Sequence, residues 1–472
     1  MDAVKRLADV VKRWLGGSHG EFDLPDLPSF PRRRESRFVN LIELLKASLM
    51  HALDSGLPHA SMTKNQQATS KLTGGFGLAA LLALNLFASP AIASEKPPVL
   101  IGLDAEFGHK TSTSANAVRQ GIEIAIDEIN RAGGVLKGRK LELVVRDNKS
   151  IPAIGVDNLR ELAAMPDLVG VFGGKYSPVV VEWIEPAHQI GLPIFATWSS
   201  ADQISEHPLR PNYIFRLSLK DAWAAPVLLG FARKHHQAER VGLLLANTAW
   251  GRSNKDALNK AAAAAGVRIV KERWYNWGDS SLIEAYLDIV QAGAQVLILV
   301  ANEAEGSILV KEVASQPVAQ RLPIVSHWGV TGGNFAQMAG AALDQLDFSV
   351  IQTFSFANAG SPVAQRVLKA LKERYGLADA ERILSPVGIA HAYDLTHLLA
   401  RAIDQAGSTD RRKIRDALEN LGPYDGLVRR YVRPFTPQRH DALGPEQAFM
   451  ARYTADDRLL PITPQATTRR GK

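Results

Sequence analysis

From Val99 onward the sequence alternates short apolar runs with longer helical patterns, and this alternation is the feature that most constrains the fold. In residues 114–134, for example, Ala117, Ile122, Ile126 and Ile129 share one helical face, and two glycines then end the helix. Short strands that are apolar on both faces and alternate with helices predict parallel sheets covered by helices on both sides. The strand candidates are residues 99–103, 140–147, 168–173, 192–197, 240–247, 268–275, 295–301, 322–327 and 346–352.

This series of strands is too long for one compact sheet, so the sequence predicts two α/β lobes. The division falls near residues 212–226, where four βα units end and a second series begins. Ligands of open α/β sheets bind beyond the carboxyl ends of the strands. Two lobes that face each other would therefore enclose a binding cleft, with the glycine turn of residues 173–177 on its wall.

A targeting signal is predicted at residues 62–93. Met62 precedes a basic flank, an apolar run at residues 76–88 and the small-residue sequence Ala91-Ile92-Ala93. This order is typical of a secretory signal peptide, and the apolar run is too short for a comfortable membrane span.

The signal predicts a mature chain that starts at Ser94 and is secreted to the periplasm. Residues 1–61 are then interpreted as a disordered or mis-annotated extension, and residues 461–472 as a disordered tail. A cytoplasmic tail before an uncleaved anchor is the alternative interpretation of the N-terminal part.

Composition excludes several classes of function. The formal net charge of +7 over 472 residues is mild and shows no long basic run, which does not indicate a nucleic-acid partner. The absence of cysteine excludes disulfides, thiolate metal sites and cysteine nucleophiles. No G-x-S-x-G or H-E-x-x-H motif is present, so the chain is predicted not to be an enzyme and to need no cofactor.

The glycine turn "GGKYS" at residues 173–177 raises the question of phosphate binding. It does not match a P-loop, because Val169 stands where the first glycine should be and Tyr176 where Ser or Thr should bind magnesium. Ser177 is predicted to cap the following helix and Pro178 to occupy its first position. Free backbone N–H groups at such a helix start attract a small anion such as a carboxylate, although an ordinary βα turn explains the same residues.

The combination of several motifs, in order, resembles the periplasmic solute-binding proteins of branched-chain amino acid type, which serve ATP-binding-cassette importers. The resemblance covers about residues 98–455 and rests on the stretches "GIEIAIDEINRAGG", "VGVFGGKYSPV", "LPIFATWSSADQI", "NTAWGRSNKDAL" and "KIRDALENL". It implies the type I periplasmic-binding fold, in which two doubly wound parallel-sheet lobes are joined by a three-crossover hinge. We place lobe 1 at residues 98–219 plus 354–428 and lobe 2 at residues 220–353 plus 429–460.

The resemblance also implies ligand-binding positions on the loops that follow the strands. Carried over one at a time, they are Tyr176, Ser177, Thr197, Trp198, Ser199, Trp250, Asn302, Glu303 and Trp328. The large rings at Trp198 and Trp328 depart from the family pattern of small or acidic residues, which puts leucine, isoleucine or valine in doubt as the ligand. A cleft with up to four aromatic rings suits a solute that is polar but also flat or partly apolar.

Several of these side chains have a second interpretation. Thr197 and Ser199 are candidates to cap the helical turn near Ala201, and Asp221 to cap the next helix or to hold an amine. Glu303 suits a ligand ammonium, or the first turn of a helix for dipole reasons alone.

Other polar and aromatic groups were assigned outside the ligand site. Glu106 and His109 either gate the cleft or are solvated, and the rings of residues 274–277 are assigned to packing or to the surface. His235 and His236 are expected at a surface helix end. No metal site is predicted there, because no further ligand spacing supports one.

The sequence therefore predicts a receptor that closes on a small polar solute, either amino-acid-like or an amide or aromatic compound, and delivers it to the permease subunits of an importer. The expected form is a monomer. A sensor of the same fold that feeds a signalling partner is the alternative, followed by a hydrolase on a similar α/β frame.

Overall fold

The computed structural model describes residues 96–462. A five-stranded sheet in the order β2-β1-β3-β4-β5 is parallel throughout, and we call it with its helices the first lobe. Its strands are β1 (Val99–Ala105), β2 (Leu141–Asp147), β3 (Leu168–Gly173), β4 (Ile194–Ala196) and β5 (Ile214–Arg216).

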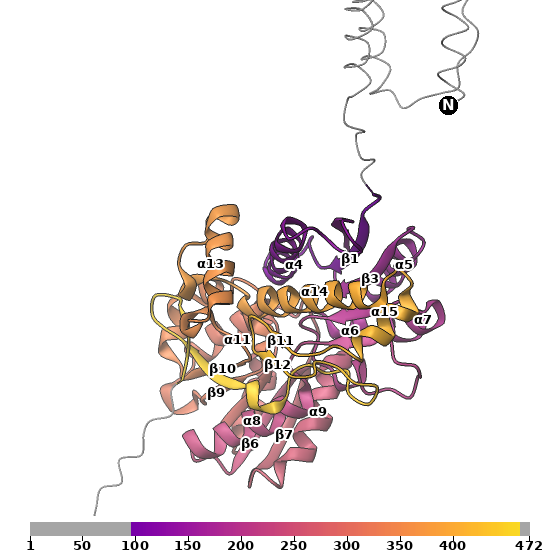
Figure 1. Cartoon of the computed structure of the whole chain (residues 1–472). Helices are drawn as coiled ribbons and strands as arrows, with labels where there is room; N and C mark the ends of the chain where they lie inside the picture. Colours follow the sequence, from indigo (N-terminus) through magenta and orange to yellow (C-terminus); the bar gives the residue numbers. More distant parts are fainter. Residues whose placement is uncertain (1–95, 463–472) are drawn as a thin grey trace, which may run out of the picture. The chain divides into compact units, whose positions relative to one another are not determined.

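Helices cover both faces of this sheet, as the sequence predicts. Apolar side chains of one core pack under α4, α14 and α15, and those of a second core pack under α5, α6 and α7. The bounds are α4 (Ser114–Arg131), α5 (Pro152–Ala163), α6 (Ser177–Glu182), α7 (Ile184–Ile190), α14 (Pro386–Ala406) and α15 (Arg411–Leu418). Figure 1 shows α14, from a late part of the chain, lying with the elements of the first lobe.

A seven-stranded sheet in the order β14-β13-β10-β9-β8-β6-β7 defines the second lobe. Its strands are parallel except near one edge, where β13 pairs antiparallel with both β10 and β14. The strands are β6 (Arg240–Ala246), β7 (Arg268–Tyr275), β8 (Val296–Val300), β9 (Ile324–Ser326), β10 (Phe348–Gln352), β13 (Phe449–Tyr453) and β14 (Leu459–Pro461). The helices are α8 (Asp221–His235), α9 (Ala249–Ala262), α10 (Ile283–Gln291), α11 (Glu303–Ala314), α12 (Phe335–Ala339) and α13 (Pro362–Tyr375).

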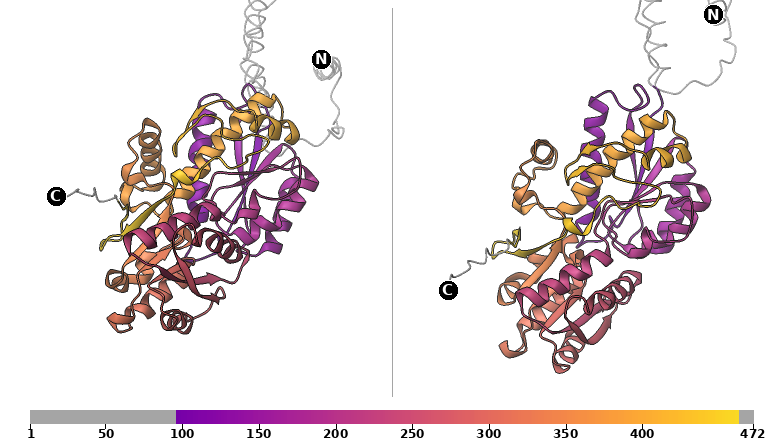
Figure 2. Two further views of the ribbon diagram at one scale, coloured as in Figure 1. Left: turned by 90° about the horizontal axis from the view of Figure 1, so that it is seen from below. Right: turned by 60° about the horizontal axis from the view of Figure 1, so that its bottom comes forward.

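The chain passes between the two sheets three times, at residues 217–220, 353–385 and 432–448. The hairpin of β11 (Tyr424–Asp425) and β12 (Arg430–Tyr431) precedes the third passage. Figure 2 shows the strands of the two sheets as separate groups with these connections beside them. The predicted two-lobe α/β fold with a three-crossover hinge is confirmed, whereas the exact residue boundaries of the lobes stay a prediction.

All nine strand candidates form strands, but five further strands among residues 96–462 were not predicted: β5, β11, β12, β13 and β14. β5 is only three residues long and lies within the stretch that was interpreted as the division between lobes. Within residues 96–462 no helix combines the length and apolarity that a membrane span requires. The predicted signal peptide, the N-terminal extension and most of the predicted tail lie outside the described residues.

Candidate functional site at the cleft

The turn between β3 and α6 starts the site. Helix α6 begins at Ser177 and Pro178 is its second residue, so the predicted cap at Ser177 is wrong and Tyr176 takes the N-cap position without a side-chain bond. The Ser177 hydroxyl instead accepts hydrogen bonds from the backbone N–H groups of Ser200 (3.2 Å) and Ala201 (3.3 Å). The turn is thereby tied to the loop that follows β4.

That second loop supports the first from behind. The Thr197 hydroxyl donates to the carbonyl of Gly173 and the Ser199 hydroxyl to the carbonyl of Gly174, both at 2.7 Å. The predicted capping role of these two residues is therefore wrong. Their hydroxyls are buried and fix the glycine turn.

The start of α8 also differs from the prediction. Lys220 occupies the N-cap and Asp221 is the first helical residue, with no capping bond. The buried Asp221 carboxylate instead faces His327, whose Nε2 atom lies 3.2 Å from Oδ1. Burial, followed by the negative charge of Asp221, raises the pKa of the neighbouring Asp202 to about 6.

A small cavity lies where the carboxyl ends of six strands meet: β3, β4, β6, β7, β8 and β9. For most of these strands, a residue that lines the cavity follows within three residues of the strand's end. The cavity volume is about 10 Å³, roughly the room that one water molecule needs, so the lobes are closed around an almost filled space. The first lobe lines it with Lys175, Tyr176, Ser177, Pro178, Trp198 and Ser200, and the second with Trp250, Trp277, Asn302, Trp328 and Gly329. Among these described residues none is acidic.

Aromatic rings form most of the wall. Tyr176 meets Trp277 edge-to-face at a centroid distance of 5.0 Å, and Trp198 lies 5.6 Å from Trp328. Both of these contacts join the two lobes. The assignment of residues 274–277 to packing or surface is therefore wrong for Trp277, which lines the cavity.

Three of the tryptophans leave a polar group unused. The indole N–H groups of Trp198, Trp250 and Trp277 are buried, and no acceptor for them lies among residues 96–462. A buried donor without a partner costs free energy, and native proteins seldom retain one unless something else binds it. Three residues of the cavity wall thus carry a buried donor that has no acceptor among the described residues.

Lys175 supplies the one charge in the lining. Its ammonium reaches across the cleft to Glu303 at the start of α11, with 2.6 Å between Nζ and Oε2. Burial alone would lower the pKa of Lys175, but the Glu303 carboxylate overcomes this and raises it above its ordinary value. The ammonium therefore stays charged.

The loop after β1 closes the cleft from the side. The backbone N–H of Thr113 donates to Gly332 O (2.8 Å) and that of Asn334 to Thr111 O (3.2 Å). Glu106 is buried and accepts hydrogen bonds from the hydroxyls of Ser112 and Ser114, so it organises this loop. His109 is exposed, with its ring 6.1 Å from that of Tyr176.

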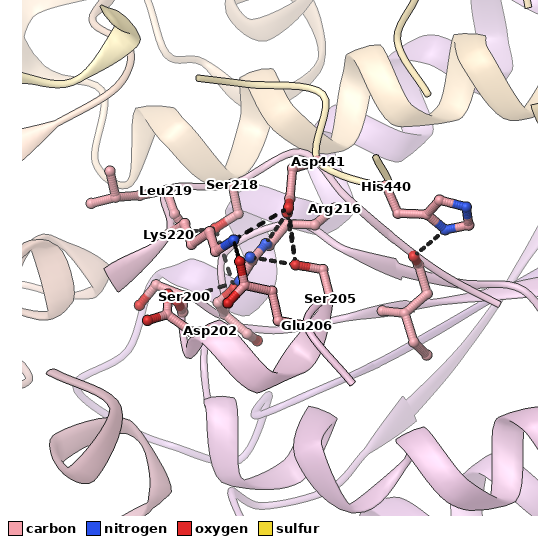
Figure 3. Close-up of polar contacts among 12 residues, drawn as sticks. Ser200, Asp202, Ser205, Glu206, Arg216, Ser218, Leu219, Lys220, His440 and Asp441 are labelled. Carbon is pink, nitrogen blue, oxygen red and sulfur yellow. Dashed lines mark hydrogen bonds and ion pairs between the residues drawn. The ribbon is translucent and has the colours of Figure 1, made fainter. Parts of the chain in front are cut away.

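A second polar network holds the hinge (Figure 3). Arg216 at the end of β5 is fully buried, and its Nε donates to Asp441 Oδ1 on the third passage at 2.6 Å. Ser205 donates to the same carboxylate, and Lys220 on the first passage pairs with Glu206. A larger cavity of about 590 Å³ adjoins this network. We take the smaller cavity as the solute site, because only it is lined by loops at strand ends of both lobes.

The predicted surface end of α8 at His235 is confirmed. Asp347, far away in sequence, brings a third potential metal ligand to His235 and His236, with ligand atoms within 4.8 Å of one another. This mostly exposed group lies at the end of α8 opposite Asp221.

Of the nine predicted ligand-binding residues, six line the cavity: Tyr176, Ser177, Trp198, Trp250, Asn302 and Trp328. Thr197, Ser199 and Glu303 lie behind it. The five lining residues that were not predicted are Lys175, Pro178, Ser200, Trp277 and Gly329. The position of Trp277, two residues beyond the end of β7, was the available signal, because the other rings also follow strand ends. Ligand binding by all these residues stays a prediction.

The comparisons with known proteins agree with this geometry. A family model described as periplasmic binding protein matches residues 98–457. The chain belongs to that family. The predicted membership of the periplasmic solute-binding proteins is thereby confirmed, and curated relatives named for Leu, Ile and Val agree with the predicted resemblance.

Individual relatives of this periplasmic binding protein are distant. A Leu/Ile/Val-binding protein homologue of Brucella abortus is 23% identical over 357 residues, which are 76% of this chain and 90% of the relative. The crystal structure of a periplasmic binding protein type 1 from Bordetella pertussis has a TM-score of 0.70 at 22% identity and covers 77% of this chain and all of that one. The solute-binding protein of an R. palustris ABC transporter, in complex with benzoate, has a TM-score of 0.63 at 16% identity and covers 78% of this chain and 98% of that one. At these identities the structures show the fold.

Proposed function

We propose that this periplasmic binding protein is a solute receptor that closes on a small planar carboxylate without an amino group and delivers it to the permease of an ABC importer. The unused indole N–H groups of Trp198, Trp250 and Trp277 carry this proposal. A carboxylate offers two oxygens, each with lone pairs for more than one donor, and hydrogen bonds to charged groups are the stronger ones.

Charge supports the absence of an amino group. The nearest carboxylates already have partners, since Glu303 is held by Lys175 and Thr111, and Glu106 by two serine hydroxyls. In the cavity lining a ligand ammonium would find ring faces and the neutral oxygens of Ser177, Ser200 and Asn302, but no carboxylate. Those rings favour a flat body, which they can stack against at low entropic cost.

The names of the relatives indicate two solute classes. The R. palustris structural neighbour holds benzoate, which is a planar carboxylate. The Brucella relatives are named for leucine, isoleucine and valine, which makes an amino acid the alternative solute class. The predicted export by the signal peptide at residues 62–93, the monomeric form and the absence of enzymatic turnover belong to the same proposal.

Matched pairs of solutes test it. Benzoate with benzylamine, 3-phenylpropanoate with phenylalanine, and 4-methylpentanoate with leucine separate the ring from the amino group. A solute at a hundred times its dissociation constant stabilises the folded protein by about 2.7 kcal/mol, which a thermal-shift assay detects. Calorimetry then gives the affinities, and chromatography of the recovered solute checks for turnover.

We expect binding of the aromatic carboxylates, weaker binding of 4-methylpentanoate and the weakest binding of the three amines. Binding of leucine with no response to its des-amino counterpart would contradict the proposed solute class. No response to any carboxylate or amino acid would contradict the receptor function for these classes.

A further inference from the structure

The ion pair between Lys175 and Glu303 joins residues from different lobes inside the protein. Their side chains are only 3% and 1% exposed. The second carboxylate oxygen of Glu303 accepts a hydrogen bond from the Thr111 hydroxyl at 3.1 Å. Each oxygen of this carboxylate thus has a partner, and both partners come from the first lobe.

The backbone around the pair leaves room for it. A Cβ atom on Gly332 would lie 2.4 Å from Lys175 Cδ, and one on Gly333 would lie 2.4 Å from Glu303 Cγ. Both distances are shorter than any real contact between carbon atoms. Glycines at these two positions therefore leave the space that the Lys175 and Glu303 side chains occupy. The ammonium also lies 5.0 Å from the centroid of the Tyr176 ring.

A carboxylate and an aromatic face are elements that recognise a primary ammonium in proteins. We propose that Glu303 and the Tyr176 ring form a cation subsite beside the solute cavity, and that the chain's own Lys175 fills it. A free solute ammonium must displace a tethered one, which has the higher effective concentration. The resulting rejection of amino solutes rests on the proposed function, whereas the subsite itself does not.

Chemical rescue tests the subsite without knowledge of the natural solute. Lys175→Ala deletes three methylenes and the ammonium, which together correspond to n-propylammonium. The variant retains a buried Glu303 carboxylate without its counter-charge, so its melting temperature should fall. Added n-propylammonium should raise that melting temperature by several degrees and leave the unmodified protein unchanged.

Matched controls isolate the subsite. Lys255→Ala removes a lysine whose partner Glu272 is 3.2 Å away, but this pair is exposed and should show no rescue. The double variant Lys175→Ala/Glu303→Gln has no carboxylate to occupy and should not respond. Neutral 1-propanol, which fills the same space without charge, should not restore Lys175→Ala.

If Lys175→Ala does not fold, Lys175→Met provides a second test, because methionine keeps most of the volume of the lysine side chain. In Lys175→Met the buried Glu303 side chain has no counter-charge, so burial should favour its neutral form in the folded state. The stability of this variant relative to the unmodified protein should therefore fall as pH rises from 4 to 8. Glu303→Gln in the same background should abolish that dependence.

The proposed cation subsite is contradicted if n-propylammonium raises the melting temperatures of Lys175→Ala and Lys175→Ala/Glu303→Gln equally. It is also contradicted if the relative stability of Lys175→Met does not change with pH. If n-propylammonium rescues Lys175→Ala but the unmodified protein binds none of the tested carboxylates, the proposed function is contradicted and the cation subsite is supported. Gain of benzylamine binding by Lys175→Met, together with loss of benzoate binding, supports both. Retention of the original solute preference by Lys175→Met contradicts the assigned specificity.

Discussion

Trp250 and Trp183 each have a buried indole N–H group without an acceptor among the described residues, but of the two only Trp250 lines the cavity. Replacement of Trp250 by Phe keeps a ring and removes the donor. If that donor binds the solute carboxylate, its loss costs about 1.5–3 kcal/mol, or about tenfold or more in affinity. Trp183→Phe makes the same chemical change in the first lobe and should leave the affinity measured by calorimetry unchanged. Equal affinities of Trp250→Phe and the unmodified protein would remove this donor from the site.

For single residues, the sequence predicted which side chains lie at the cavity better than it predicted their hydrogen-bond and ion-pair partners. Rings that follow strand ends reach the cavity, because parallel strands bring their carboxyl ends together, and this placed Trp198, Trp250 and Trp328. The hydrogen bonds of Thr197 and Ser199 to the glycine turn depend on how two loops stack, which local pattern does not encode. The partner of Lys175 lies 128 positions away on the other lobe, so the sequence did not indicate it.

Among the elements, α4 and α14 pack directly against each other at Gly121. A Cβ atom there would lie 2.2 Å from the carbonyl oxygen of Ile389, so Gly121→Ala must push the helices apart. We expect a loss of about 1–3 kcal/mol in the free energy of unfolding. Gly230→Ala, in α8, meets nothing within 4 Å and should gain up to about 1 kcal/mol through helix propensity. Chemical denaturation measures both, and a neutral Gly121→Ala would contradict the close helix contact.

The side chain of Asp104 connects β1 with α5 and makes folding sensitive to pH. Burial raises the pKa of Asp104 from 3.8 to about 7, although hydrogen bonds from Asn158 and Asn148 act in the opposite direction. The folded state then keeps a proton that the unfolded state has lost, so this group makes stability fall as pH rises from about 4 to 7. Asp104→Asn should show a smaller decrease in melting temperature between pH 5 and pH 8 than the unmodified protein.

The exposed Asp157 on α5 provides the control for this prediction. Its side chain is 78% exposed, and Asp157→Asn should retain the pH profile of the unmodified protein. Parallel profiles for Asp104→Asn and Asp157→Asn would show that Asp104 does not titrate in this range.

The elements themselves follow from the sequence where they are long and periodic. Seven of the nine strand candidates could be assigned because they are largely apolar and buried on both faces, whereas the edge strands β2 and β7 carry charged residues and are only partly buried. The three-residue β5 could not be assigned, since it is too short to show a pattern. β13 pairs with β10 only when the chain returns to the second sheet, and β14 then adds to β13 at the edge. The network of Arg216 and Asp441 depends on the same return.

The whole molecule is held closed by contacts that do not involve a solute. The loop after β1 bonds to residues 332–334, Lys175 bonds to Glu303, and Tyr176 meets Trp277. A solute larger than one water molecule must therefore separate the lobes before it binds. It stabilises the closed form only by interactions that exceed those it replaces.

Selective ¹⁵N labelling of tryptophan tests the central claim that one carboxylate bridges both lobes. The chain has eight tryptophans, and each contributes one indole N–H resonance. On saturation with benzoate, or with the best carboxylate from the matched pairs, the account predicts downfield proton shifts for Trp198 of the first lobe and for Trp250 and Trp277 of the second, with Trp183 unmoved. Binding seen by calorimetry while the resonances of these three residues stay in place, or shifts confined to one lobe, would contradict it.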